Sequence, residues 1–217
     1  HWAKGWQTAD EYLSGNVRQK LRTAQRVAAR DPFFAGNVDA LIAAQPKDLE
    51  ASEIEVRLGA TWLDKKYIEQ FMYETFETPR YLRGQIEISF VPYTAEWQVS
   101  RKSMVRYNDV AAFTTYGTDR ASAYRLLEDA LNLRDIRIYD TIEDADGRER
   151  RVLNAKETTL AAQKQQLIRD AFKDWIWKDP ERRETLVRQY NEEMNSTRPR
   201  EYDGSHIVFS GMNPEII

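Results

Sequence analysis

The residue types that carry most enzyme chemistry are scarce in this chain. Its 217 residues include no cysteine and two histidines, His1 and His206. Without cysteine the chain has no disulfide, no thiolate zinc site, no iron–sulfur cluster and no cysteine nucleophile. Two histidines at opposite ends of the sequence disfavour a Ser-His-Asp triad and a metal site built from several histidines.

Nucleotide and methyl-donor sites leave glycine-rich signatures, which this sequence lacks. A P-loop needs Gly-Lys followed by Ser or Thr, so that backbone amides hold the phosphates. Dinucleotide and S-adenosylmethionine sites usually rest on a glycine-rich loop after the first strand. The nine glycines are scattered singly, without Gly-Lys or Gly-x-Gly. The residues therefore favour a non-catalytic segment that holds no cofactor of its own.

One enzymatic alternative remains, because Mg²⁺-dependent nucleases need only carboxylates and a lysine. Asp140, Glu149 and Lys156 flank a predicted hairpin in a suitable order. Charged residues make up 31% of the chain, so a triple of this kind arises easily by chance. A metal-dependent nuclease is therefore the least favoured hypothesis.

A stripe of arginines could contact nucleic acid. Arg18, Arg22, Arg26 and Arg30 recur every four residues within 16–30, a window without acids. On a helix this spacing places them along one face, where guanidinium groups can follow a phosphate backbone. The alternative is a solvated face that pairs with acids elsewhere in the chain.

A second cationic group lies where residues 97–108 contain no acid. It combines charge with aromatic rings, as proteins that bind single strands do. Ordinary cross-strand packing of the rings is the alternative. The net charge of −3 creates no general attraction to DNA, so contact would depend on local patches. The members of this group are Trp97, Arg101, Lys102, Arg106 and Tyr107.

Capping residues and apolar periodicity predict the elements that must position these side chains. In the N-terminal part they predict three short helices: one capped by Thr8 and Glu11 and running to about Ser14, one capped by Asn16 and ended by Asp31-Pro32, and one from Val38 to Ala44 capped by Asn37.

In the rest of the chain, apolar residues recur with the helical period in some stretches and alternate, as in strands, in others. We expect a brief strand at Ile54, Val56 and Leu58; a helix capped by Thr61 that buries Leu63, Tyr67, Ile68, Phe71, Met72 and Phe76; and a hairpin of Ile86, Ile88 and Phe90 with Trp97 and Val99. We then expect a helix opened by Thr118-Asp119; a hairpin turning at Asp146-Gly147; a long helix capped by Asn154 that carries Leu160, Leu167, Ile168, Ala171, Trp175 and Ile176; and a helix capped by Asp179-Pro180 that buries Leu186, Tyr190 and Met194.

These elements predict an α+β fold, mostly helical with two or three small antiparallel hairpins. Residues 1–196 are expected to form one accessory domain, with a tolerable internal boundary in 77–118, and residues 197–217 a connector. No apolar run approaches the roughly 18 to 20 residues that span a bilayer, and the N-terminus lacks a signal segment. We therefore expect a cytoplasmic protein without a membrane partner.

The C-terminal third carries sequence motifs that are more specific, and two earlier stretches accompany them. Together they resemble the segment just upstream of the ATPase motor in very large SNF2-like, antirestriction-type helicase and adenine-specific DNA-methylase polypeptides of bacterial mobile elements and phages. The motifs are residues 159–166 (TLAAQKQQ), 172–183 (FKDWIWKDPERR), 198–206 (RPREYDGSH) and 211–215 (GMNPE), with 12–21 (YLSGNVRQKL) and 57–62 (RLGATW) before them.

The resemblance implies a methyltransferase-like region before this segment and a helicase motor after it. ATP with Mg²⁺ and S-adenosylmethionine would serve those regions of the parent polypeptide. None of the family's catalytic residues has a position in this chain. We therefore expect a non-catalytic accessory or linking domain, cut out of a longer polypeptide, whose partners are DNA and the flanking helicase and methylase domains. The alternative is a protein-docking structural module without DNA contact.

Overall fold

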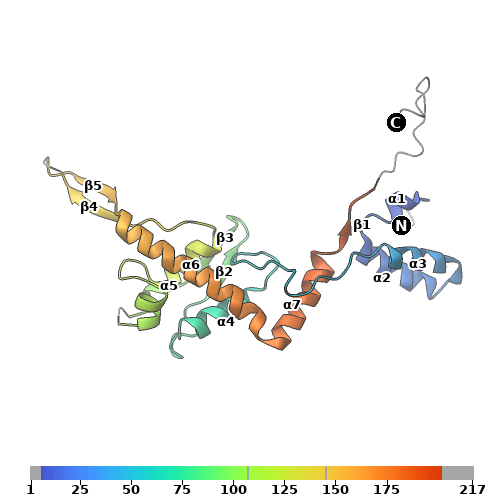
Figure 1. Cartoon of the computed structure of the whole chain (residues 1–217), viewed down its shortest axis with the longest axis horizontal. Helices are drawn as coiled ribbons and strands as arrows, with labels where there is room; N and C mark the ends of the chain where they lie inside the picture. Colours follow the sequence, from blue (N-terminus) through green and yellow to red (C-terminus); the bar gives the residue numbers. More distant parts are fainter. Residues whose placement is uncertain (1–5, 107, 145, 202–217) are drawn as a thin grey trace, which may run out of the picture. The chain divides into compact units, whose positions relative to one another are not determined.

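The computed structural model describes residues 6–106, 108–144 and 146–201 (Figure 1). These residues are mostly helical, and their strands form three two-stranded antiparallel sheets, which confirms the predicted α+β class. The chain divides into two compact units. We call Ile54–Thr185 the central unit, and His1–Glu53 together with Leu186–Ile217 the split unit.

These unit borders differ from the internal boundary that the sequence suggested. The stretch 77–118 lies wholly inside the central unit. In the split unit, β1 (Gly15–Asn16) pairs with β6 (Thr197–Arg198) and so joins two segments far apart in the sequence. A contact of this range leaves no local signal in either segment. Residues 202–217 of the predicted connector, including His206, lie outside the described residues.

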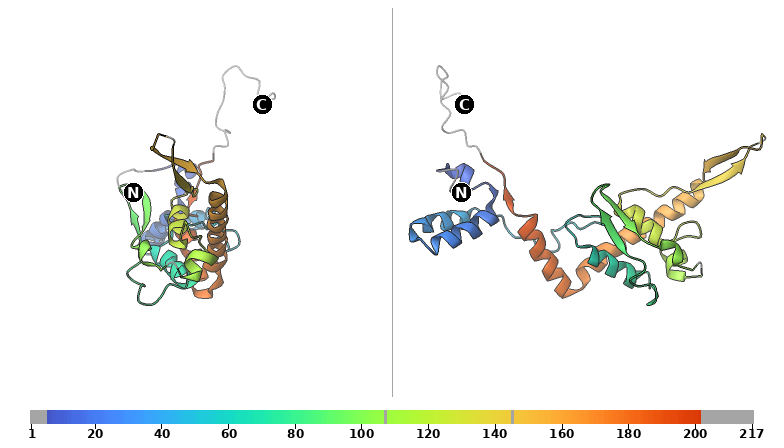
Figure 2. Two further views of the ribbon diagram at one scale, coloured as in Figure 1. Left: turned by 90° about the vertical axis from the view of Figure 1, so that its left-hand side faces the viewer. Right: turned by 180° about the vertical axis from the view of Figure 1, so that it is seen from behind.

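Two helices form the body of the split unit. They are α2 (Val17–Ala28) and α3 (Ala35–Ala43), which lie side by side in Figures 1 and 2. Asn16 caps α2 as predicted, since its side chain accepts the Gln19 amide at 2.9 Å. The helices bury a small apolar core of Val17, Ala24 and Leu41, with Tyr12, Leu13, Leu21 and Val38 packed against it.

Two predicted caps in this unit need correction, one in its hydrogen bond and one in its position. The short α1 (Ala9–Tyr12) follows Thr8, but the Thr8 side chain makes no capping bond. Thr8 instead hydrogen-bonds the Asp10 carboxylate, and this bond together with Arg200 lowers the pKa of Asp10 to about 2.

Asn37 does not begin a helix, because α3 already starts at Ala35. A 3-10 turn at Pro32–Phe34, capped by the Asp31 side chain, leads directly into it. Asn37 therefore lies within the first turn of α3.

The central unit has more regular structure, and one long helix runs along it (Figures 1 and 2). Its elements are α4 (Lys65–Thr75), β2 (Ile88–Val91), β3 (Glu96–Val99), α5 (Ala123–Leu131), β4 (Tyr139–Glu143), β5 (Glu149–Leu153), α6 (Ala155–Lys178) and the first residues of α7 (Pro180–Glu193).

Aromatic rings from three helices form the core of the central unit. Phe71 of α4 packs edge-on against Phe172 of α6, with ring centroids 5.1 Å apart. Phe76 makes a similar contact with Tyr124 of α5 at 5.3 Å. The Tyr124 hydroxyl shares a 2.7 Å hydrogen bond with Thr78, and its burial raises the pKa of Tyr124 to about 12. The helices are therefore held by directional ring contacts as well as by apolar burial.

Arg182 closes the C-terminal end of α6. Its guanidinium donates to the carbonyls of Ile176 at 3.0 Å and Trp175 at 2.6 Å, which would otherwise lack partners at the helix end. It also lies 3.6 Å from the Trp175 ring centroid, in a cation–π contact. Arg182 is only 9% exposed, and desolvation lowers its pKa. The Asp179 side chain accepts the Arg182 amide at 2.7 Å, which confirms the predicted cap of α7.

Three predicted features of the central unit need correction. Ile54, Val56 and Leu58 are buried, as their alternation suggested, but they form no strand because no other strand pairs with them. The cap of α4 is Asp64, whose carboxylate accepts the Lys66 amide, and not Thr61. Thr118 does not begin α5, because a turn between Thr118 and Ala121 precedes the true cap, Ser122.

The apolar residues predicted for the last two helices are not all buried. In α6, Ile168 and Ile176 are buried, whereas Leu160 and Leu167 are 40% and 43% exposed. Met194, which was expected to be buried, is 53% exposed. The inner face predicted for α4 is correct: Leu63, Tyr67, Ile68, Phe71, Met72 and Phe76 are all buried.

Gly59 provides a test of the central packing. Its φ is +82°, and a Cβ at this position would lie 2.1 Å from the Leu131 carbonyl oxygen. We expect Gly59→Ala to lower the free energy of unfolding by about 2 to 4 kcal/mol, because it combines left-handed strain with a backbone clash.

Gly36 is the matched control. A Cβ there would have no atom within 4 Å, and α3 favours alanine. Gly36→Ala should leave the unfolding free energy unchanged or raise it by up to about 1 kcal/mol. Denaturant unfolding followed by circular dichroism measures both variants, and equal losses would contradict this account.

Candidate nucleic-acid interface

The first arginine of the predicted stripe is turned inward. Arg18 donates from Nε to the Asn195 carbonyl at 3.0 Å and forms an ion pair with Asp48. Its side chain is 18% exposed. The neighbouring Lys20 donates to three backbone carbonyls at the end of α1, the nearest being Ser14 at 2.7 Å. These two cations therefore hold the split unit together and are not part of an open binding face.

The other three arginines of the stripe remain on the surface. Arg22 is 60% exposed while paired with Glu192 at 3.2 Å. Arg26 is exposed and donates to its own helix, to the Arg22 carbonyl at 3.3 Å and to Thr23 at 3.4 Å. Arg30 is exposed just beyond the end of α2. Among the described residues, neither Arg26 nor Arg30 forms an ion pair.

Two of these arginines border a shallow hollow, which is lined by Arg22, Gln25, Arg26 and Ala29. No acid contributes to this lining. We call the surface formed by Arg22 and Arg26 of α2, together with Arg30 just beyond the helix, the arginine face. It is an open, cationic surface in a place where an extended anion could lie.

The second cationic group does not offer the stacking surface that its rings suggested. Trp97 is 6% exposed and packs across the hairpin on Phe90, with ring centroids 5.0 Å apart. Lys102 pairs with Glu128, which also accepts the Val99 amide at 2.8 Å.

Cross-strand packing, the alternative reading of Trp97, is therefore what the structure contains. Arg101 and Arg106 are exposed. Tyr107 lies outside the described residues. In this group, therefore, Arg101 and Arg106 are the exposed cations, and the Trp97 ring is buried.

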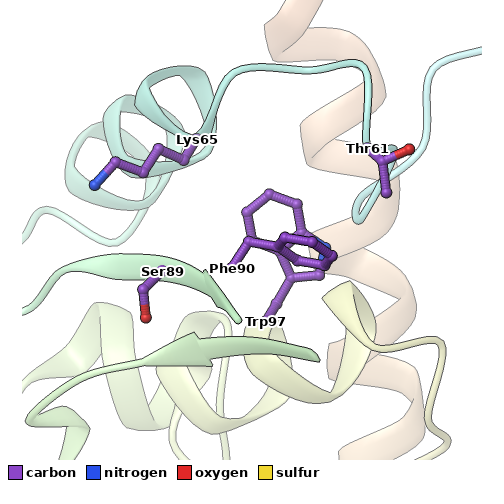
Figure 3. Close-up of a pocket in the computed structure, with 5 residues that line it drawn as sticks. All are labelled: Thr61, Lys65, Ser89, Phe90 and Trp97. Carbon is purple, nitrogen blue, oxygen red and sulfur yellow. The ribbon is translucent and has the colours of Figure 1, made fainter. Parts of the chain in front are cut away.

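Trp97 and Phe90 also line a half-open hollow of about 360 Å³ in the central unit (Figure 3). Its polar members are Thr61, Lys65 and Ser89. In Figure 3 their polar ends point apart, and the Lys65 ammonium lies away from the two rings. Catalytic and small-molecule sites place a few polar groups so that they converge on one point. This arrangement therefore does not resemble such a site.

The three residues of the nuclease hypothesis are not brought together. The Asp140 carboxylate accepts from Arg120 at 2.8 Å and from Asn154 at 2.7 Å, and these bonds lower its pKa. Glu149 lies opposite Glu143 in the ladder. Glu143 is three residues beyond Asp140 in β4, so Glu149 and Asp140 are about 10 Å apart along the hairpin. Among the residues that the structure describes, no cluster of three or more histidine, aspartate or glutamate side chains is placed to hold a metal ion.

Comparison with known proteins adds one result. Residues 57–196 match a family described as a domain of unknown function, DUF8437. The chain belongs to the DUF8437 family. No curated protein and no solved structure matches it. The DUF8437 match contains the second cationic group and the two hairpins of the central unit, whereas α2 precedes it. Within the described part of this DUF8437 member, every helix is too short or too polar to cross a membrane.

The different environments of the arginines predict different effects on stability. Arg18→Ala removes a mostly buried guanidinium that donates to a backbone carbonyl and pairs with the exposed Asp48, so the free energy of unfolding should fall by about 1 to 2 kcal/mol. Arg26→Ala, on the arginine face, should change it by less than about 0.5 kcal/mol. Urea unfolding of the two variants checks this. An Arg26→Ala loss as large as that of Arg18→Ala would show that the arginine face is structural.

Proposed function

We propose that this chain is a non-catalytic accessory domain that contacts the phosphate backbone of DNA through the arginine face. The observation that carries the proposal is the exposure of Arg22 and Arg26 on successive turns of α2 and of Arg30 just after it, two of the three without an acidic partner among the described residues. We further propose that the domain works in the cytoplasm, as part of a larger polypeptide with DNA helicase and DNA-methylase regions.

The spacing of the arginine face suits a polyanion. Residues four apart on a helix are separated by about 6 Å along the axis, so neighbouring guanidinium groups can reach different phosphates of one strand. Guanidinium is also the side-chain group best matched to phosphate oxygens. Contacts of this kind fix position on DNA but carry no information about the base sequence. The proposed binding is therefore sensitive to salt and indifferent to sequence.

The covered Trp97 ring limits what kind of contact is proposed. Proteins that prefer single strands stack bases on exposed aromatic rings. With Trp97 packed on Phe90, that component is not available from the described part of the second cationic group. The proposal therefore rests on charge alone, with Arg101 and Arg106 as secondary contacts at most.

The larger polypeptide is supported by the sequence resemblance described above. In that setting ATP with Mg²⁺ and S-adenosylmethionine belong to the flanking regions, and this domain links them and holds DNA. The geometry of Asp140 and Glu149 gives no support to a nuclease, because the hairpin holds these carboxylates apart. Docking to the flanking domains without any DNA contact is the second candidate, and it is favoured by the internal use of Arg18.

Titration of the full chain with labelled duplexes of different sequence tests the proposal. We expect similar affinities for all sequences and a steep loss of affinity with salt. The double variant R26A/R30A should bind more weakly to every duplex, and the slope of log affinity against log salt should be shallower by about 2.

The variant R57A/R80A is the control, because it removes two exposed arginines from the central unit. It should bind nearly as well as the parent chain. Equal weakening by the two double variants would mean that total charge matters and not the arginine face. Absence of salt-sensitive binding by the parent chain would rule out DNA contact and leave the docking function.

A further inference from the structure

The hairpin of β4 and β5 extends beyond the N-terminal end of α6, away from the other elements of the central unit (Figures 1 and 2). All five residues of β5 are exposed, and so are the last three of β4. A two-stranded ribbon by itself is marginally stable in water, and a third strand or a packed surface normally completes it. In the described residues this hairpin has neither along most of its length.

The hairpin exposes apolar side chains on both of its faces. Val152 is 38% exposed and Leu153 is 48% exposed. As neighbours in one strand they point to opposite faces. Ile142 of β4 is 49% exposed. Apolar side chains at these positions contribute little to the core, and those of Val152 and Leu153 would be partly covered if another strand lay beside β5.

The hydrogen-bond pattern shows which backbone groups of β5 are free. Asp144 donates to Arg148, and Asn154 donates to Ile138, both at 2.9 Å. Bonded pairs alternate along an antiparallel ladder, so Arg150 and Val152 form the bonds to β4. Glu149, Arg151 and Leu153 therefore direct their N–H and C=O groups outward. The described residues provide no second strand on that side, which leaves an edge able to receive one.

Charge distinguishes the two strands. β5 and its turn carry Arg148, Arg150 and Arg151, none of which forms an ion pair with a described residue, and Arg151 lies over the Tyr139 ring at 4.8 Å. Across the ladder, Glu143 and Glu149 face each other near the turn. The free edge therefore has an apolar end and a cationic middle, and acids lie at its tip, where they would repel a nucleic acid.

We propose that the outer edge of β5 binds an acidic, strand-forming peptide segment of another protein, which adds antiparallel as a third strand. Two apolar residues of that segment would lie opposite Leu153 and Val152, and two acidic residues would follow opposite Arg151 and Arg150. Backbone bonds to Arg151 and Leu153 supply affinity, and the charge order supplies specificity. This surface is separate from the arginine face, so the inference stands independently of DNA binding.

The test measures fluorescence anisotropy of a short labelled peptide whose centre is Val-Ile-Glu-Asp, titrated with the full chain. We expect saturable binding. Charge reversal in R150E/R151E should weaken it by about tenfold or more, because two attractive cross-strand pairs become repulsive. The same variant should gain affinity for a peptide with Val-Ile-Lys-Arg at its centre. R57E/R80E is the control of equal charge and should bind the acidic peptide almost as the parent chain does.

A backbone variant separates strand addition from simple charge attraction. Arg151→Pro removes an outward amide without removing a ladder bond, and proline is tolerated at such edge positions. Arg151→Pro should lower the affinity for the acidic peptide more than Arg151→Ala does.

Three results would overturn the proposal: no binding of the acidic peptide by the parent chain, equal binding by the parent and R150E/R151E, or equal binding by the proline and alanine variants. Loss of duplex binding in R150E/R151E, or loss of self-association seen by sedimentation, would identify nucleic acid or a second copy as the occupant instead.

Discussion

The packing of the central unit depends on one constraint: the backbone carbonyls and amides at the two ends of α6 need hydrogen-bond partners. A helix leaves unpaired carbonyls at one end and unpaired amides at the other, and burial makes each one costly. At the C-terminal end Arg182 supplies a buried guanidinium to two carbonyls and to the Trp175 ring. At the N-terminal end Asn154 accepts the Glu157 amide and donates to Asp140 of β4. One helix thus fixes the base of the projecting hairpin and the start of α7.

The cations of this chain serve two purposes, and sequence spacing alone does not separate them. Arg18, Lys20 and Arg182 all donate to backbone carbonyl oxygens. Arg18 joins α2 to a segment far along the chain, whereas Lys20 and Arg182 close the ends of the helices just before their own, α1 and α6. The guanidinium groups of the arginine face and of β5, in contrast, are exposed to solvent. A chain with a net charge of −3 can therefore present two local cationic surfaces, one proposed for phosphate and one for acidic side chains. Each surface acts over a short range, since salt screens it within about 10 Å.

Features governed by neighbouring residues were predictable from the sequence. Asn16, Asn154 and Asp179 cap their helices as expected, because a cap involves only the next three residues. The buried face of α4 and the Asp-Gly hairpin also follow from local periods. Thr8 and Asn37 failed for an equally physical reason: Asp10 competes for the Thr8 hydroxyl, and the turn capped by Asp31 starts the next helix early.

Features that depend on distant contacts were not predictable. The residues around Arg18 give no signal that its side chain pairs with Asp48 and donates to Asn195. The residues around Gly15 likewise give no signal that it pairs with Arg198. The sequence allowed two interpretations of Trp97, stacking on bases or packing across the hairpin. Its ring contact with Phe90 shows that it packs across the hairpin. The missed surface, the free edge of β5, had a signal: a predicted hairpin with three arginines in its turn and second strand. Its meaning required knowing that no described strand covers that edge.

Arginine-specific chemical modification of the full chain, read by mass spectrometry with and without duplex DNA, tests the central claim most directly. The account predicts that DNA protects Arg22, Arg26 and Arg30, while Arg148, Arg150 and Arg151 react as before. Protection confined to the hairpin arginines, or no protection at saturating DNA, would contradict it.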